Sequence, residues 1–211
     1  EKALTGVTTL AVDGSQIYPS NDWSIPVAAV QVGTFENPHL GMGEYKRSIK
    51  FEPISPLDLL GNDPDDVTLQ DAVNERRHCL EIETLIDWMR SHEGEPGRRV
   101  ALFDGSLVVS FATNLRPRYV ESVLDLVEAS EETQTPVVGY LDSSRARDLS
   151  QMYSWLDNGS PTRLIDGVFL PESKWLQRTP AFVCARAKGL ENYDRRGRQS
   201  DIYFAYLRSS R

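Results

Sequence analysis

The sequence predicts an α/β fold in which a mixed five-stranded sheet is flanked by helices. Three strand-like apolar runs follow one another at the start of the chain, before any segment with helical spacing. Helical and strand-like segments then alternate, and further strand-like runs close the chain. The same three residues, Asp-Gly-Ser, follow two of the strand-like runs. We expect one domain over residues 1–211 with extra C-terminal strands.

The first three predicted strands span residues 7–12, 27–35 and 45–51. Their short connections favour an antiparallel meander. Apolar periodicity predicts the later elements in chain order: a helix over 69–92, a strand over 100–103, a helix over 117–130, a strand over 136–141, a helix ending near 155, and late strands over 181–187 and 202–207. The chain begins without Met and stops just after a strand-like run, so we expect a trimmed C-terminus.

Composition excludes some classes of protein. A net charge of −8 argues against a protein that coats nucleic acid without specificity, because phosphate binding depends on Lys and Arg. It does not exclude a nuclease, whose acidic site adds negative charge. Cys79 and Cys184 lie in apolar surroundings, so we expect reduced core cysteines in a cytoplasmic protein. No apolar run approaches the roughly 20 residues of a membrane span, and no signal peptide is recognisable.

Asp13 and Asp104 are the first candidates for chemistry, because each follows an apolar strand and precedes Gly and Ser. Gly directly after a carboxylate favours a sharp turn at the end of a strand. Two carboxylates side by side cannot both stay ionised at low cost unless a metal or a shared proton relieves them. One Asp-Gly-Ser is typical of an ordinary turn. Two copies at matching strand ends predict a metal site.

The predicted helix over 69–92 supplies a third carboxylate. On a helical wheel, Glu83 falls within an apolar face formed by residues such as Leu69, Val73 and Leu80, whereas Glu81 points elsewhere. We therefore choose Glu83 as the helix-borne ligand, with Glu81 as the open alternative. The competing interpretation of Glu83 is an ion pair with Arg76.

This order of carboxylates, on the first strand, the helix after the third strand and the fourth strand, resembles the layout of ribonuclease H-like nucleases. The doubled motif resembles the NurA nuclease family, and it stands here as AVDGSQIYPS at 11–20 and LFDGSLVVSF at 102–111. The segments VVGYLDSS at 137–144 and YFAYLR at 203–208 also match strands of that family. The resemblance therefore covers most of the chain.

The resemblance implies that Asp13, Glu83 and Asp104 bind divalent cations and are catalytic. Two ions, Mn²⁺ or Mg²⁺, would fit these oxygen ligands and assist phosphodiester hydrolysis. It also implies a 5′–3′ DNA exonuclease and single-strand endonuclease that acts in DNA end resection and double-strand break repair. The implied partners are DNA, a HerA-type hexameric ATPase and a second copy of the chain.

Two features depart from the family pattern. Asp142 stands where the family usually has a basic residue, and no His here matches the one near the family's C-terminus. His39, His78 and His92 lie in predicted loops or on a helix, so we interpret them as surface residues. A missing terminal segment would explain the absent His.

Candidates for holding nucleic acid are Ser15, Ser106, Tyr18, Arg145 and Arg147. Basic side chains can follow a phosphate backbone while aromatic rings stack on unpaired bases. Further candidates for this track are Trp23, Arg116, Arg118, Tyr153, Arg195, Arg196 and Arg198.

Two other classes of function compete with a nuclease. An actin-like ATPase or sugar kinase has phosphate loops that resemble Asp-x-Gly-Ser/Thr, but the chain is short for two such lobes, and Gly follows Asp directly here. A catalytically silent module that only docks an ATPase ring is the third class. Retention of the three carboxylates favours an enzyme.

Overall fold

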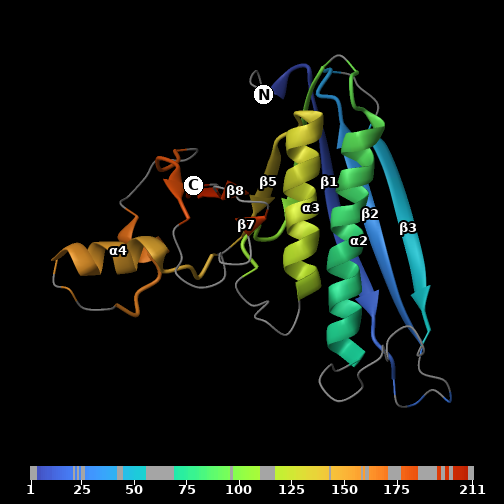
Figure 1. Ribbon diagram of the computed structural model, residues 1–211, viewed down its shortest axis with the longest axis horizontal. Coiled ribbons are helices and arrows are strands. Elements are labelled where there is room, and N and C mark those ends of the chain that lie inside the picture. Colours follow the sequence, from blue (N-terminus) through green and yellow to red (C-terminus); the bar gives the residue numbers. More distant parts are fainter. Residues whose placement is uncertain are drawn as a thin grey trace. The chain divides into compact units, whose positions relative to one another are not determined.

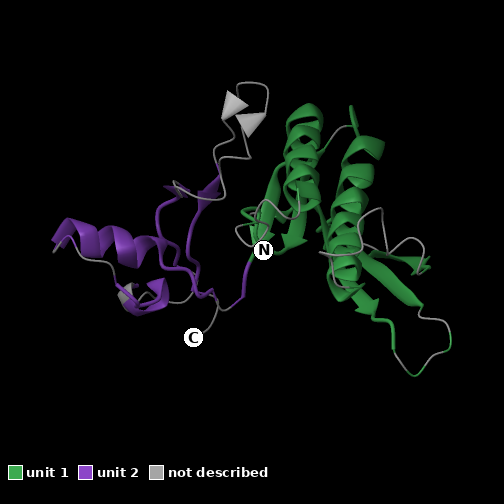
Figure 2. Ribbon diagram, turned by 60° about the horizontal axis from the view of Figure 1, so that its bottom comes forward, with its two compact units in different colours: residues 1–140, 187–199 green, residues 141–186, 200–211 purple. Residues whose placement is uncertain are grey.

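The computed structural model describes residues 4–20, 22, 24, 27–41, 45–55, 69–95, 97–109, 117–142, 144–157, 159, 162–170, 177–184, 194–195, 198–199 and 202–208. The chain divides into two compact units (Figure 2). Unit 1 comprises Glu1–Tyr140 and Ala187–Gln199, and unit 2 comprises Leu141–Arg186 and Ser200–Arg211. Among the described residues, no helix has both the length and the apolar character needed to cross a membrane.

Unit 1 begins with an antiparallel meander, as the sequence predicts. Its strands are β1 (Val7–Ile17), β2 (Ala28–Asn37) and β3 (Lys46–Ile54) (Figure 1). The expectation that the first strand stops at residue 12 is wrong, because β2 continues to pair with β1 as far as Ile17. The first Asp-Gly-Ser therefore lies inside a strand, with Asp13 opposite Gly33, and does not form a turn.

Two parallel strands complete the sheet. β4 (Arg98–Asp104) pairs with β1, and β5 (Val137–Tyr140) pairs with β4, which gives the order β3-β2-β1-β4-β5. Parallel neighbours need long crossovers, and one helix lies in each of the two connections. This arrangement confirms the predicted mixed, ribonuclease H-like sheet. The second Asp-Gly-Ser does follow a strand, since Asp104 is the last residue of β4.

The crossover helices α2 (Leu69–Ser91) and α3 (Pro117–Thr133) lie side by side across one face of the sheet (Figure 1). Pro is well suited to the first turn of α3, where its missing N–H costs no hydrogen bond. The core lies between these helices and the sheet. Its most deeply buried apolar side chains include Val30, Val32, Val73, Leu80, Leu85, Met89, Phe103, Val123 and Leu126.

Strand alternation decides which side chains of the sheet meet α2. Glu36 of β2 accepts a hydrogen bond from Trp88 of α2, so the neighbouring Phe35 points to the other face. Phe35 is exposed, as are Ile49 and Phe51 on the edge strand β3. The apolar core of unit 1 is thus built on the helix side.

Unit 2 contains α4 (Asp148–Asp157) and α5 (Asp166–Phe169), with β6 (Phe182–Val183) antiparallel to β9 (Tyr203–Phe204). A further hairpin, β7 (Asp194–Arg195) with β8 (Arg198–Gln199), falls in unit 1. The extra C-terminal strands are therefore present, but each is two residues long.

The buried carboxylate of Asp166 connects three segments of unit 2. It accepts hydrogen bonds from the backbone N–H of Leu149 and Ser150 in the first turn of α4, and from the hydroxyl of Tyr206. Burial raises the pKa of Asp166, but these hydrogen bonds outweigh burial and hold it below its ordinary value. Asp166 therefore has a structural role, because its oxygens satisfy helix N–H groups that have no intrahelical partner.

Candidate active site

Asp13 and Asp104 lie next to each other in the sheet, as the doubled motif predicts. The parallel ladder between β1 and β4 ends with Val12 opposite Phe103, so the following residue on each strand is an aspartate. Neighbouring strands are about 4.8 Å apart, and side chains in register on parallel strands point to the same face. Both aspartates are exposed. Two carboxylates therefore stand together where β4 ends.

Gly14 allows side chains of α2 to lie close to strand β1. A Cβ atom built at this position would collide with Oε1 of Glu81 and would lie 2.9 Å from Cγ of Arg77. Only glycine therefore allows the α2 side chains to come this close to β1. The Gly of the first motif is needed for this close approach, and not for the turn that the sequence suggested.

Glu81 is the α2 carboxylate whose charge interacts with those of the two aspartates. Its side chain is 5% exposed. Burial, with smaller contributions from the charges of Asp13 and Asp104, raises the pKa of Glu81 to about 7, although Arg77 opposes the rise. Three carboxylates from β1, α2 and β4 thus interact with one another electrostatically.

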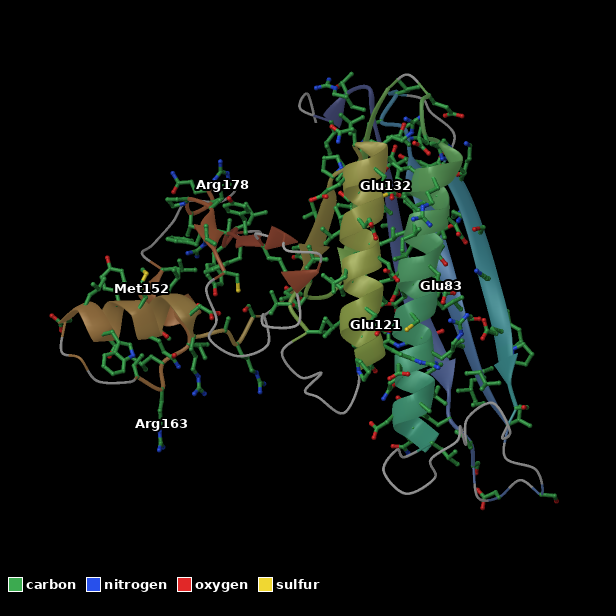
Figure 3. The ribbon with its side chains drawn as sticks, viewed as in Figure 1. Glu83, Glu121, Glu132, Met152, Arg163 and Arg178 are labelled. Atoms are coloured by element: carbon green, nitrogen blue, oxygen red, sulfur yellow. The ribbon has the colours of Figure 1, made fainter. Side chains whose placement is uncertain are left out.

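Glu83 does not face this cluster. It lies on α2 (Figure 3), and its Oε1 accepts a hydrogen bond of 2.6 Å from Nη1 of Arg76. The same guanidinium donates through Nε to Oε1 of Glu52 on β3 at 2.7 Å. These hydrogen bonds to Glu52 and Glu83 raise the pKa of Arg76 above its ordinary value. Glu81 is therefore the α2 carboxylate whose charge interacts with Asp13 and Asp104, and Glu83 forms the ion pair with Arg76 that was the competing interpretation.

The sequence contains a signal for Glu81 that the wheel analysis missed. The helix face that contains Glu83 is defined by apolar residues in the first half of α2, whereas most buried apolar residues of α2 lie in its second half. Glu81 is four residues before Leu85 and seven before Trp88, both of which are buried. Positions with this spacing share one face of a helix, so Glu81 belongs to the buried face.

Arg77 forms an ion pair with the carboxylate of Glu81. Its Nη1 donates a short hydrogen bond to Oε1 of Glu81, one helical turn further along α2. Within the described residues, Nε of Arg77 is buried and has no hydrogen-bond partner. The Arg77 guanidinium is therefore paired with the buried carboxylate of Glu81.

Two of the other predicted site residues have structural contacts. The Tyr18 hydroxyl donates to Oδ1 of Asn74 on α2 at 2.6 Å and accepts from Nε2 of Gln16 at 2.8 Å. The Ser106 hydroxyl donates to the carbonyl oxygen of Val108 and accepts from its N–H, which closes the turn after β4.

The remaining predicted contacts to nucleic acid lie in different parts of the chain. Ser15 is exposed and follows Asp13 on the same face of β1. Arg145 and Arg147 are exposed and belong to unit 2. Arg118 lies 4.0 Å from Glu75. Trp23, Arg116 and Arg196 lie outside the described residues.

The interpretation of His78 as a surface residue is wrong. His78 is buried, and its ring packs edge-on against Phe103 and tilted against Tyr119. Burial, together with the charge of Arg77, lowers the pKa of His78 to about 4. It is therefore neutral at pH 7 and belongs to the core. Cys79 is half-buried, and burial raises its pKa to about 11.

The donor set of Asp13, Glu81 and Asp104 fits a hard divalent cation, because it offers only carboxylate oxygens. Gly14 leaves the space in which the Glu81 carboxylate lies against β1. In the described part of the chain, no group of three acidic, His or Cys side chains already has an arrangement that could hold a metal. At Glu81 it is Arg77 that faces the carboxylate.

Strand order, crossover helices and paired aspartates together define a protein of the ribonuclease H-like class. Comparison with family models narrows this class. The model of the NurA domain matches residues 7–211, so the chain belongs to the NurA domain family. Among curated proteins, no relative matches the chain.

Comparison with solved structures finds a similar fold in a nuclease of this family. The chain is similar to the crystal structure of the NurA nuclease from Sulfolobus solfataricus, with a TM-score of 0.59 and 17% identity. That match covers 95% of this chain and 63% of the other, so this chain spans less than two thirds of that protein. A second match, LC9-RNase H1, a type 1 RNase H with the type 2 active-site motif, has a TM-score of 0.36 at 11% identity and covers 76% of this chain and 77% of that one.

Proposed function

We propose that this protein is a divalent-metal-dependent nuclease, with Asp13, Glu81 and Asp104 as its metal ligands. Glu81 thereby replaces Glu83 in the set expected from the sequence. The observation that carries the proposal is the buried Glu81 carboxylate, which lies against Gly14 and interacts with both aspartates. A buried carboxylate is costly unless it is paired or coordinates a metal, and this one, which is paired with Arg77, also interacts with the charges of two further carboxylates.

The three carboxylates would hold Mn²⁺ or Mg²⁺, and we propose two ions. When bound, such ions lower the pKa of a water and stabilise the leaving oxygen of a phosphodiester. The chain's own contribution is placement. β1 and β4 fix two carboxylates in register, and α2 brings the third from the helix layer above the sheet.

DNA is the proposed substrate, by resemblance to the NurA nuclease family. The same resemblance supports 5′–3′ exonuclease and single-strand endonuclease activity in double-strand break repair. A HerA-type ATPase and a second copy of the chain are the proposed partners. Light scattering of the purified chain tests the homodimer, since a monomeric mass at micromolar concentration would contradict it.

Arg145, Arg147 and Ser15 are the exposed residues that we propose as contacts to the nucleic acid. A basic side chain that contacts one phosphate contributes about one unit to the salt dependence of binding. Replacement of Arg147 by Ala should therefore weaken DNA binding and lower the slope of log K against log salt by about 1. Fluorescence anisotropy with labelled DNA measures both quantities, and an unchanged slope would exclude the contact.

The direct test of the proposed activity uses the purified chain with 5′-labelled single- and double-stranded DNA. Cleavage is expected with Mn²⁺ and should stop when a chelator is added. The variants Asp13→Ala and Asp104→Asn should remove activity while circular dichroism shows an unchanged fold. Lack of cleavage by a folded wild-type chain would instead favour a silent docking module, and ATP hydrolysis by the chain alone would favour the actin-like class.

A further inference from the structure

Arg77 and Glu81 form an ion pair where α2 lies close to Gly14 of β1. The side chain of Arg77 is 30% exposed, and that of Glu81 is 5% exposed. The stem of Arg77 lies against Gly14, which also touches the Glu81 carboxylate. The ion pair therefore lies between α2 and β1, against Gly14, the residue that follows Asp13 in the sequence.

The charges around Glu81 explain why an arginine stands there. Arg77 donates a hydrogen bond to the carboxylate of Glu81, whose side chain is buried, and a buried carboxylate is costly unless it is paired. Without a metal, Arg77 therefore supplies the positive charge that compensates Glu81. A divalent cation would supply the same compensation more strongly, because attraction scales with the product of the charges.

A metal ion and Arg77 would compete for the same carboxylate of Glu81. Arg77 contacts Oε1 of Glu81, and a metal ligated there would repel the guanidinium at close range. The arginine also has less to lose than a fully bonded one, because its Nε–H is buried without a hydrogen-bond partner in the described structure. Its Nη groups are on a long side chain that can turn toward solvent.

Arg76 shows what a purely structural arginine looks like on the same helix. Its guanidinium is held by two carboxylates, with three contacts of 2.6 to 2.7 Å to Glu52 and Glu83. A charge held on both sides by carboxylates is difficult to move. Arg77 has one carboxylate partner that a metal would also bind.

We propose that Arg77 is a displaceable counter-ion, which holds Glu81 in the metal-free protein and leaves it when a divalent cation binds to Asp13, Glu81 and Asp104. Arg77 is thus a positioning residue that sets the metal affinity. The inference rests on the proposed function. Before a metal binds, the positive charge of Arg77 compensates the negative charge of Glu81. A metal ion that binds must therefore displace Arg77 from Glu81.

The experiment is a titration of the full chain with MnCl₂, with free Mn²⁺ measured by electron paramagnetic resonance. Arg77→Met removes the charge but keeps an apolar stem against Gly14, and it should tighten Mn²⁺ binding about tenfold, within the range typical of coupled sites. Arg77→Lys keeps the charge and should bind Mn²⁺ nearly as weakly as the wild type. Arg76→Met makes the same change of charge one residue earlier and should shift the affinity less than twofold.

A double-mutant cycle separates displacement from a general effect of charge. With Glu81→Gln in the background, Arg77→Met should no longer tighten Mn²⁺ binding. If Arg77→Met does not fold, as judged by its thermal unfolding, Arg77→Gln takes its place. Binding by the Arg77 variant that is no tighter than that of Arg76→Met would overturn the inference.

The outcomes also separate this inference from the proposed function. Wild-type Mn²⁺ binding that Asp13→Asn abolishes, combined with an Arg77 variant of unchanged affinity, overturns the counter-ion role alone. Absence of Mn²⁺ binding by the wild type, or binding that Asp13→Asn leaves unchanged, overturns both.

Discussion

Two neighbouring arginines of α2 end in opposite environments. Arg76 bridges Glu52 and Glu83 on a partly exposed side of the helix, whereas Arg77 pairs with the buried Glu81 beside Asp13 and Asp104. The two arginine–glutamate pairs have the same residue types, but Arg76 and Glu83 are seven residues apart and Arg77 and Glu81 are four residues apart. Glu83 shares Arg76 with Glu52 of β3. Glu81 instead lies against Gly14 of β1 and interacts with the charge of Asp104 at the end of β4. The surroundings of a pair, and not its residue types, decide whether it is structural or belongs to the site.

The substitutions Glu81→Gln and Glu83→Gln should show the largest difference between the two ion pairs. Glu81→Gln removes a proposed ligand, so Mn²⁺-dependent DNA cleavage should fall by more than about 100-fold, beyond the 10–100-fold typical of residues that only support a ligand. Glu83→Gln should keep cleavage within about threefold of the wild type, since it weakens only an ion pair with half-exposed partners. Initial rates on labelled single-stranded DNA measure both. The reverse order of effects would place the site at Glu83.

Gly14→Ala tests the contact between β1 and α2. The added methyl group meets the Glu81 carboxylate and the Arg77 stem, so it should cost about 1–3 kcal/mol of stability and also lower Mn²⁺ affinity. Gly33→Ala is a matched control on the facing strand, because its nearest atom, the Asp13 carbonyl oxygen, is 3.8 Å away. Urea unfolding and Mn²⁺ titration of both variants provide the measurement. Equal effects of the two substitutions would contradict the close approach.

The pH dependence of stability distinguishes Glu81 from Glu83 without any assay of activity. Burial, with Asp13 and Asp104 adding to it, raises the pKa of Glu81 from 4.5 to about 7, so the folded chain binds this proton more tightly than the unfolded chain. The contribution of Glu81 to stability is therefore lost as pH rises from about 4.5 to 7. Glu81→Gln should remove that loss, and its stability relative to the wild type should rise with pH.

His78 titrates in an overlapping window with the opposite sign. Its pKa is lowered from 6.5 to about 4, so protonation of the unfolded state destabilises the fold as pH falls through that interval. Both proteins contain His78, so its effect cancels in the difference between the variant and the wild type. Chelator-treated samples unfolded in urea at pH 4.5 to 8 give the difference curve. A flat curve, or the same rise for Glu83→Gln, would count against a special environment of Glu81.

Arg76→Met should have the smallest effect of the series. Its partners are partly exposed, and ion pairs of this kind contribute about 1 kcal/mol or less. Cleavage should remain at the wild-type level. Thermal unfolding together with the cleavage assay checks both parts. A strong loss of activity in a stably folded Arg76→Met protein would erase the distinction between the two arginines.

Much of unit 1 could be predicted from the sequence, because its elements carry strong local signals. The meander, the helix over 69–92 and the mixed sheet follow from apolar periodicity. The nearness of Asp13 and Asp104 follows because each aspartate comes directly after the last pair of the β1–β4 ladder, Val12 opposite Phe103.

The helix-borne carboxylate is easily misplaced from the sequence because the apolar stripe of α2 changes face along the helix. Its first half suggested a side that includes Glu83, while Leu85 and Trp88 in the second half determine how the helix packs. The role of Gly14 is equally invisible in the sequence. Gly after Asp is typical of a turn, and only the continued pairing with β2 keeps it extended, so that its missing side chain admits Glu81.

Anomalous difference density from crystals grown with MnCl₂ shows directly which carboxylates bind the metal. We expect Mn²⁺ beside the carboxylates of Asp13, Asp104 and Glu81, with the Arg77 guanidinium turned away from Glu81. Mn²⁺ bound at Glu83 and Glu52, or a metal at the aspartates without a contribution from Glu81, would contradict it.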